Sequence, residues 1–242
     1  TVWHEHAAPG HYCGLRHAGD GAGGMTVSRH LQWLRRRSQG RFELRLAVLV
    51  FVLLALAQLV LVAHAQVPAQ ARYRAELVRA AHTQWGLDAP VAALAAQVHQ
   101  ESGWRPDAVS HVGARGMAQF MPATATWWCA LNGLGAAACQ PHNPTWALRA
   151  LVGYDKYLFD RTPVRYGERD RMWVALRSYN GGLGHWQKEA AVSGTAQPSR
   201  SQVDAACGKA RRAAVHCKEN LGYPHHILVV LQPRYAAWGP GL

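Results

Sequence analysis

Apolar residues between positions 66 and 242 recur at the spacing of an α-helix. Val91, Leu94, Ala95 and Val98 follow one another at i, i+3, i+4 and i+7, which places them on one face of a helix. The alternation of apolar and polar residues that marks a half-buried strand is nearly absent. The pattern therefore predicts a single all-α domain over residues 66–242, which is long enough to bury a sizeable core.

Proline, glycine and asparagine mark where these helices begin and end. We expect Asp88 to cap the helix of Val91 and Val98, with Pro90 in its first turn and Ser102-Gly103 at its end. The other expected helices cover residues 71–85, 122–131, 144–158 (capped by Asn143), 170–179 and 201–214, and residues 224–238 form a final apolar segment interrupted at Pro233.

The run from residue 46 to 62 has a different pattern, because it is apolar throughout except for Gln58. Arginines precede it, and Ala63-His64-Ala65 after it matches the small-x-small site of signal peptidase. We therefore predict an export signal over residues 25–65. It is cleaved after Ala65, or residues 46–62 are retained as an anchor in the inner membrane.

The first 24 residues are rich in glycine and have no apolar period. We expect them to be a disordered upstream extension, with translation starting at Met25. In both versions of the export signal the remainder of the chain is exported, to the periplasm or the cell envelope.

The exported part contains four cysteines, an even number that in an oxidising compartment indicates two disulfides. Three pairings are conceivable. We prefer Cys129 with Cys139 and Cys207 with Cys217, because each pair closes a short loop and contributes roughly 2–3 kcal/mol on the chain-entropy model. No CxxC motif or ligand spacing of histidines indicates a metal, and we expect neither a metal nor a cofactor.

The chain is basic, with a net charge of +12, and residues 66–242 hold 19 basic against 11 acidic residues, a net charge of +8. Such a surface suits an anionic polymer such as nucleic acid, a lipid headgroup layer or an acidic cell-wall glycan. The basic residues are dispersed, and no zinc-finger spacing or RNA-binding aromatic motif is present. We therefore expect no nucleic-acid partner.

Glu101 is the clearest candidate for a catalytic residue. It lies seven residues after Leu94, so it projects from the apolar face of its helix, close to the helix C-terminus. The macrodipole and the loss of hydration both raise the pKa of such a carboxyl above about 4.3, as a general acid requires. The alternative is a structural ion pair with Arg105 or Arg115.

Two further stretches could build a cleft beside Glu101. In the loop after the helix, Met117 and Phe120 offer apolar surface for the face of a sugar, and Gln119 offers a donor and an acceptor. Tyr179 and Asn180 precede two glycines at the end of another helix. Taken alone, each of these stretches is equally compatible with a core position or a helix end.

Together and in this order, the three stretches resemble the soluble lytic transglycosylases, a goose-type-lysozyme-like family (glycoside hydrolase family 23 type). Glu101-Ser102 matches the family's catalytic motif. The loop from Gly113 to Pro122 resembles its G-x-x-G-x-M-Q-x-M-P pattern, with Ala118 standing between Met117 and Gln119. Ser178-Tyr179-Asn180-Gly181-Gly182 resembles its A-Y-N-x-G motif, with Ser in place of Ala. The resemblance covers residues 70–190 and fades afterwards.

The resemblance implies a lysozyme-like fold and cleavage of the β-1,4 bond between N-acetylmuramic acid and N-acetylglucosamine in peptidoglycan. Glu101 would be the single acid and base, and the product would carry a 1,6-anhydro end. It also implies a monomer that binds glycan strands. The implied substrate-binding residues are Ser102, Met117, Gln119, Phe120, Tyr179, Asn180 and a terminal tyrosine, for which Tyr223 and Tyr235 are both available.

Two other functions fit the same residues. A hydrolytic muramidase would need a second carboxylate near Glu101, for which Asp107 and Asp155 are candidates. A non-catalytic module for wall binding or envelope assembly would keep the fold without using the acid.

Overall fold

The computed structural model describes residues 46, 48–56 and 69–242, and the chain divides into two units, 1–65 and 66–242. In the first unit, residues 48–56 are helical. No helix among the described residues is both long and apolar enough to cross a membrane. The predicted extension over 1–24, the start at Met25 and the cleavage site at Ala65 all lie outside the described residues.

The second unit is helical, as predicted, and the described residues contain isolated β-bridges but no strand. The α-helices are α2 (Ala69–Trp85), α3 (Val91–Ser102), α4 (Pro122–Leu131), α5 (Pro144–Asp160), α6 (Glu168–Gly181), α7 (Leu183–Ala191), α8 (Arg200–Ala205) and α9 (Cys217–His225). The shorter or wider turns are the 3-10 segments η1 (Ala136–Ala138), η2 (Ala214–His216) and η4 (Gln232–Trp238), and the π-helical segment η3 (His226–Leu231).

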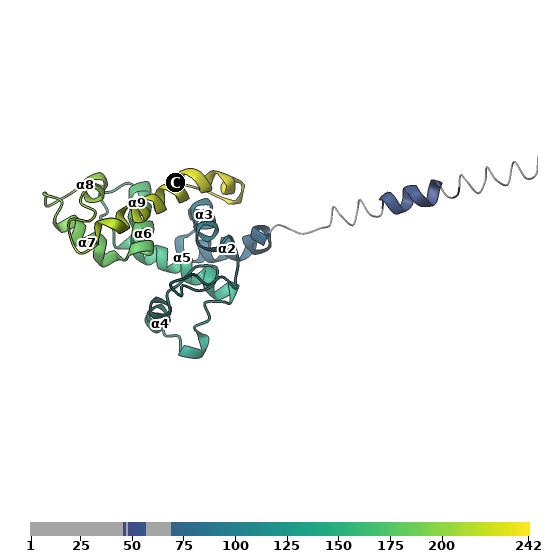
Figure 1. The fold of residues 1–242 in the computed structure, drawn as a ribbon, viewed down its shortest axis with the longest axis horizontal. Coiled ribbons are helices and arrows are strands. Elements are labelled where there is room, and N and C mark those ends of the chain that lie inside the picture. The colour runs from purple at the N-terminus through teal and green to yellow at the C-terminus, as the bar shows by residue number, and fades with distance from the viewer. Residues whose placement is uncertain (1–45, 47, 57–68) are drawn as a thin grey trace, which may run out of the picture. The chain divides into compact units, whose positions relative to one another are not determined.

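Helix α3 lies at the centre of the core. It packs against α2 on one side and against η3 and η4 of the C-terminal segment on another (Figure 1). Every residue from Val91 to Val98 is buried, and all of them except Gln97 are apolar. Gly103, in the left-handed conformation with φ 60°, ends the helix and donates its N–H to the carbonyl of His99.

The expectation that Asp88 caps α3 is wrong. The helix begins at Val91 after Pro90, whose side chain makes no capping hydrogen bond, and so Pro90 precedes the first turn. The N–H of Ala92, in the first turn of α3, has no acceptor within the helix and donates to the carbonyl of Pro240 at 2.9 Å. A tertiary contact with the C-terminus therefore replaces the local cap.

The second half of the domain differs most from the expected helices. The helix expected over 201–214 ends at Ala205, and the chain then turns at Gly208, where φ is 76° and a Cβ would lie 2.9 Å from Cα of Ala214. Helix α7 was not expected. The segment expected to begin at Pro224 begins at Cys217. The sequence analysis missed residues 217–223 because they have no apolar period of their own.

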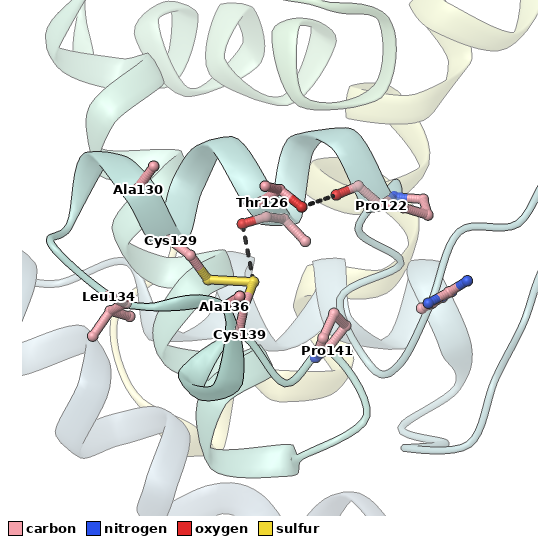
Figure 2. A pocket seen from close by; sticks show the side chains of 10 residues that line it. Pro122, Thr126, Cys129, Ala130, Leu134, Ala136, Cys139 and Pro141 are labelled. Atoms are coloured by element: carbon pink, nitrogen blue, oxygen red, sulfur yellow. Dashed lines mark hydrogen bonds between the residues drawn. A yellow bond between two sulfur atoms is a disulfide. The ribbon is translucent and has the colours of Figure 1, made fainter.

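Both preferred disulfides are confirmed. Cys129 on α4 is bonded to Cys139, just after η1, and this bond closes a small hollow beside α4 (Figure 2). Cys207, just after α8, is bonded to Cys217, the first residue of α9. The second bond therefore anchors the start of α9, the helix that contacts Glu101.

Candidate active site

Glu101 is half-buried in the last turn of α3. One of its carboxyl oxygens, Oε1, accepts a hydrogen bond from the hydroxyl of Tyr223 on α9. The carboxyl lies in the wall of an open hollow of about 540 Å³ between the end of α3 and α9. The hollow is lined by Gln100, Glu101, Asn180, Val215, Lys218, Glu219, Gly222, Tyr223 and His226.

The surroundings raise the pKa of Glu101 to about 8. Burial is the largest cause, the hydrogen bond from Tyr223 opposes it, and the negative charge of Glu219 adds to the rise. The alternative ion pair is not formed, because Arg105 donates from Nε to the carbonyl of Ser102 at 3.0 Å and Arg115 lines the separate hollow beside α4. Glu101 is therefore protonated at neutral pH.

Tyr223, and not Tyr235, is the tyrosine that contacts Glu101. Tyr223 is buried, which holds the pKa of its hydroxyl well above the usual range, so it stays a neutral donor. The hydroxyl of Tyr235 instead lies 2.8 Å from the indole nitrogen of Trp104 and 2.7 Å from Nδ1 of His99. Tyr235 thus belongs to the packing of the C-terminal segment.

The loop after α3 packs into the core beside the site, and its apolar side chains do not line the hollow. Met117 is 0% exposed and Phe120 is 2% exposed, which contradicts the expectation that these side chains offer a surface to a sugar. Phe120 packs instead against Trp146 and Tyr154 of α5, with ring centroids 5.5 and 5.8 Å apart. The spacing that resembles a sugar-binding wall is, for these two residues, a core pattern.

The side chains of Ser102 and Gln119 donate to backbone carbonyls of the loop after α3. Ser102 is buried and donates from Oγ to the carbonyl of Met117 at 2.9 Å, while Gln119 donates from Nε2 to the carbonyl of Gly116 at 2.8 Å. Neither residue lines the hollow. They hold the loop against the end of α3, and so they act on the position of Glu101 rather than on the hollow itself.

Tyr179 and Asn180 have different roles at the end of α6. The hydroxyl of Tyr179 donates to the carbonyl of Ala118 at 2.6 Å, which joins α6 to the loop behind the site. Asn180 lines the hollow, and its Nδ2 donates to Oε1 of Glu219 at 3.2 Å. Only Asn180, Tyr223 and Glu101 of the sequence-derived site residues therefore reach the hollow.

Glu219 is the main residue that the sequence analysis missed. It is exposed, lines the hollow with Glu101, and lies four residues before Tyr223, so both side chains are on one face of α9. This E-x-x-x-Y spacing was the available signal. Asp107 does not line the hollow, and Asp155 is 0% exposed, so neither proposed second carboxylate faces it.

Asp155 forms a buried pair with Gln97, one turn before Glu101 on α3. The Nε2 of Gln97 donates to Oδ1 of Asp155 at 3.3 Å, whereas Oε1 of Gln97 and Oδ2 of Asp155 have no partner. Burial holds the pKa of Asp155 well above its usual range. A protonated Asp155 leaves this buried pair without a net charge.

Within the described residues, no cluster of three or more histidine, cysteine or acidic side chains is arranged to hold a metal ion. The chemistry available in the hollow is thus that of one protonated carboxyl, its hydroxyl partner and a second carboxylate held by an amide. This is the arrangement of a general acid in a polar, solvent-open site.

Fold and site together define an all-α domain in which Glu101, at the end of the central helix, is a glutamic acid with a raised pKa. Residues 76–201 match the family model described as Transglycosylase SLT domain, and the chain belongs to this family. Tyr223 and Glu219 lie beyond the matched residues.

Curated relatives are similar over part of the chain. The membrane-bound lytic murein transglycosylase F of Alteromonas mediterranea is 38% identical over 92 residues, which are 38% of this chain and 18% of that protein. The protein of the same name from Marinobacter nauticus is 37% identical over 109 residues, 44% of this chain and 20% of its own length. The chain therefore spans about a fifth of the length of these relatives.

Among solved structures, an inactive glutamate-to-glutamine mutant of the lytic transglycosylase Slt from Pseudomonas aeruginosa is similar in fold. The TM-score is 0.51 at 22% sequence identity, with 70% of this chain and 25% of that chain covered. The lysozyme-like helical fold expected from the sequence is confirmed at this level.

Proposed function

We propose that this protein is an exported peptidoglycan lytic transglycosylase. The observation that carries the proposal is the carboxyl of Glu101, half-buried, hydrogen-bonded by Tyr223, with its pKa raised to about 8 in the wall of an open hollow. Family membership and relatives named for murein cleavage support the same activity. The substrate is the glycan strand of peptidoglycan, whose acidic character suits the basic domain.

The reaction begins with Glu101 protonated. Its proton passes to the glycosidic oxygen between N-acetylmuramic acid and N-acetylglucosamine, and the bond from that oxygen to C1 breaks. The resulting carboxylate then takes the proton of the C6 hydroxyl of the muramoyl unit, and O6 bonds to C1. The products are a 1,6-anhydro end and a free N-acetylglucosamine hydroxyl, and no water is consumed.

Tyr223 supports both halves of this cycle. A neutral hydroxyl that donates to Oε1 binds a carboxylate more strongly than a carboxylic acid, so it stabilises the charge that appears when the proton leaves. Asn180 and Glu219 orient the glycan in the hollow. The loop and α6 are held in place around Glu101 by the remaining candidate residues, which are Ser102, Met117, Gln119, Phe120 and Tyr179.

The proposal includes the location and state of the enzyme. The apolar run over 46–62, the two disulfides and relatives named as membrane-bound support export to the periplasm or envelope, with or without an inner-membrane anchor. We propose that the enzyme acts as a monomer without a cofactor.

Digestion of purified murein followed by mass spectrometry tests the activity. We expect fragments with anhydromuramic ends from the wild type and none from Glu101→Gln, which keeps the shape of the side chain and removes its acid. Persistent cleavage by Glu101→Gln would refute the role of this residue. Binding of murein without cleavage by the wild type would favour a wall-binding module.

A hydrolytic muramidase is the second candidate, and the position of Glu219 favours it. A second carboxylate in the same hollow is what a hydrolase needs to activate water or to act as a nucleophile. The same digest distinguishes the two reactions, because hydrolysis yields reducing ends in place of anhydro ends. If reducing ends appear and vanish in Glu219→Gln, the hydrolytic reaction is correct.

A further inference from the structure

A chain of hydrogen bonds runs from the buried core between α6 and α9 to the wall of the hollow. Arg177 donates from Nε to Oδ1 of Asn220 at 3.0 Å. Asn220 donates from Nδ2 to the carbonyl of Arg177 at 2.9 Å and to Oδ1 of Asn180 at 3.0 Å. Asn180 in turn donates from Nδ2 to Oε1 of Glu219 at 3.2 Å. The chain thus ends on a carboxylate that faces the hollow.

The buried end of this chain is held rigidly. Arg177 is 0% exposed, and its two terminal nitrogens each donate at 2.6 Å, Nη2 to Glu189 and Nη1 to Asp204. Arg212 donates to the other oxygen of Glu189 at 2.8 Å. Two charge-assisted hydrogen bonds to two different carboxylates fix the plane of the guanidinium, so the Nε–H that reaches Asn220 has one direction.

Asn220 is also fixed by close packing. It is 1% exposed, and the backbone of Gly181 approaches it so closely that a Cβ at Gly181 would lie 2.5 Å from Nδ2 of Asn220 and 2.3 Å from Nη1 of Arg212. The glycine after Asn180 therefore makes room for the amide of Asn220. Neither rotation nor a flip of this amide is available without losing bonds to Arg177.

The direction of every bond follows from this arrangement. The oxygen of Asn220 is bound by the guanidinium, so only its NH₂ is presented to Asn180. Asn180 must then turn its oxygen inward to accept, which turns its own NH₂ outward to Glu219. With the opposite orientation, Asn180 would present an oxygen to the carboxylate and repel it.

We propose that Asn220 is a positioning residue, which sets the amide orientation of Asn180 and thereby holds the Glu219 carboxylate in the wall of the hollow. The inference rests on the proposed function of this hollow. Through Glu219 the chain also bears on Glu101, because the negative charge of Glu219 is one of the causes that keep Glu101 protonated. Asn220 touches neither substrate nor acid itself.

Asn220→Asp is the decisive substitution, because it keeps the shape and the acceptor for Arg177 and removes both donors. We expect kcat for anhydro-product release to fall about 10- to 100-fold, the loss of one hydrogen bond to a charged group, with KM changed less than about threefold. Asn132→Asp is the matched control. Its amide donates only to the carbonyl of Trp128 at 2.8 Å, beside a different groove, so kcat should stay within about twofold.

Asn180→Asp tests the same link from its other side, and it leaves the buried bonds around Arg177 intact. It keeps the acceptor for Asn220 and loses the donor to Glu219, so we expect the same fall in kcat. In the double variant the losses should not multiply, because both changes break one link. Multiplicative losses, or a kcat within twofold of the wild type in Asn180→Asp, would overturn the proposal.

The products of the wild type test the proposed function, and kcat of the Asn220→Asp variant tests the positioning role of Asn220. A wild type that yields no anhydro ends contradicts the proposed function. An active wild type together with a folded Asn220→Asp variant of unchanged kcat contradicts the positioning role alone. If Asn220→Asp fails to fold by circular dichroism, Asn180→Asp decides the question by the criterion already given.

Discussion

The hydroxyl of Tyr223 donates a hydrogen bond to the carboxyl of Glu101, although the two residues are 122 positions apart in the chain. One stands at the end of the central helix α3 and the other on α9. This bond is the point at which the C-terminal segment meets the acid.

Tyr223→Phe should slow the reaction and move its pH dependence. Without the hydroxyl, the carboxylate formed after proton donation loses its donor, so we expect kcat to fall about tenfold. The same bond lowers the pKa of Glu101, and its loss should raise that pKa and shift the alkaline limb of the kcat/KM profile to higher pH. A shift to lower pH would contradict the role given to Tyr223.

Glu219→Gln should shift the alkaline limb in the opposite direction. The wild type is expected to lose activity as the pH rises through about 8, because Glu101 must be protonated to donate. Glu219 contributes to the raised pKa through its negative charge, so a neutral glutamine should bring the limb to lower pH. The profile of kcat/KM from pH 5 to 10 measures this, with an unchanged limb as the contrary result.

Stability should fall as the pH rises, and Glu101 should be one cause. The pKa of Glu101 is about 8 in the folded chain against an ordinary 4.5, so the folded state binds more protons between these values. Its contribution is complete below about 4.5 and is lost as the pH rises through about 8. Asp155 acts in the same sense, but it is present in wild type and variant alike.

Glutamine does not titrate, so the Glu101→Gln variant lacks this pH-dependent contribution. Comparing its stability with that of the wild type shows whether Glu101 lowers stability as the pH rises. We expect the melting temperature of Glu101→Gln to exceed that of the wild type by more at pH 8 than at pH 5. Thermal melts of both proteins at the two pH values provide the comparison. An excess that is equal at both pH values would mean that Glu101 titrates alike in the folded and unfolded chains.

The two disulfides should differ in their effect on activity. Each closes a loop with a sequence separation of 10, so on the chain-entropy model each should contribute roughly 2–3 kcal/mol to the free energy of unfolding. Only Cys207–Cys217 anchors α9, which carries Glu219 and Tyr223. We expect the Cys207→Ser/Cys217→Ser pair to lower kcat at temperatures where it is fully folded.

The Cys129→Ser/Cys139→Ser pair is the matched control. That bond lies beside α4 (Figure 2), and neither cysteine lines the hollow of Glu101, so its loss should lower the melting temperature with kcat little changed. Equal losses of kcat in the two pairs would show that α9 does not depend on its own disulfide.

The sequence allowed α3 and Glu101 to be predicted because the apolar stripe through Leu94 and Val98 is complete and ends at the acid. The disulfides followed from short spacings. Met117 and Phe120 were misplaced because the same apolar spacing serves a core and a sugar-binding wall, and only packing against α5 decides between them. The cap of α3 was missed because its partner, Pro240, is distant in sequence.

The choice of Tyr223 over Tyr235 could not be made from the sequence for a related reason, and the spacing of Glu219 from Tyr223 was the one signal for Glu219. Helix α9 has no apolar period that reveals its start, and it lies after the residues that match the family. The amide chain through Asn220 depends on a bond direction that is fixed by a buried guanidinium. Such a direction exists only once α6 and α9 have packed together.

The distance in sequence between Glu101 and Tyr223 also sets an order of assembly. A chain that is made or threaded from its N-terminal end presents the acid well before its hydroxyl partner. Until α9 has folded back and Pro240 has closed the start of α3, the carboxyl is an ordinary, hydrated glutamate that is ionised at neutral pH. The raised pKa of Glu101 therefore depends on a segment that follows it by more than a hundred positions.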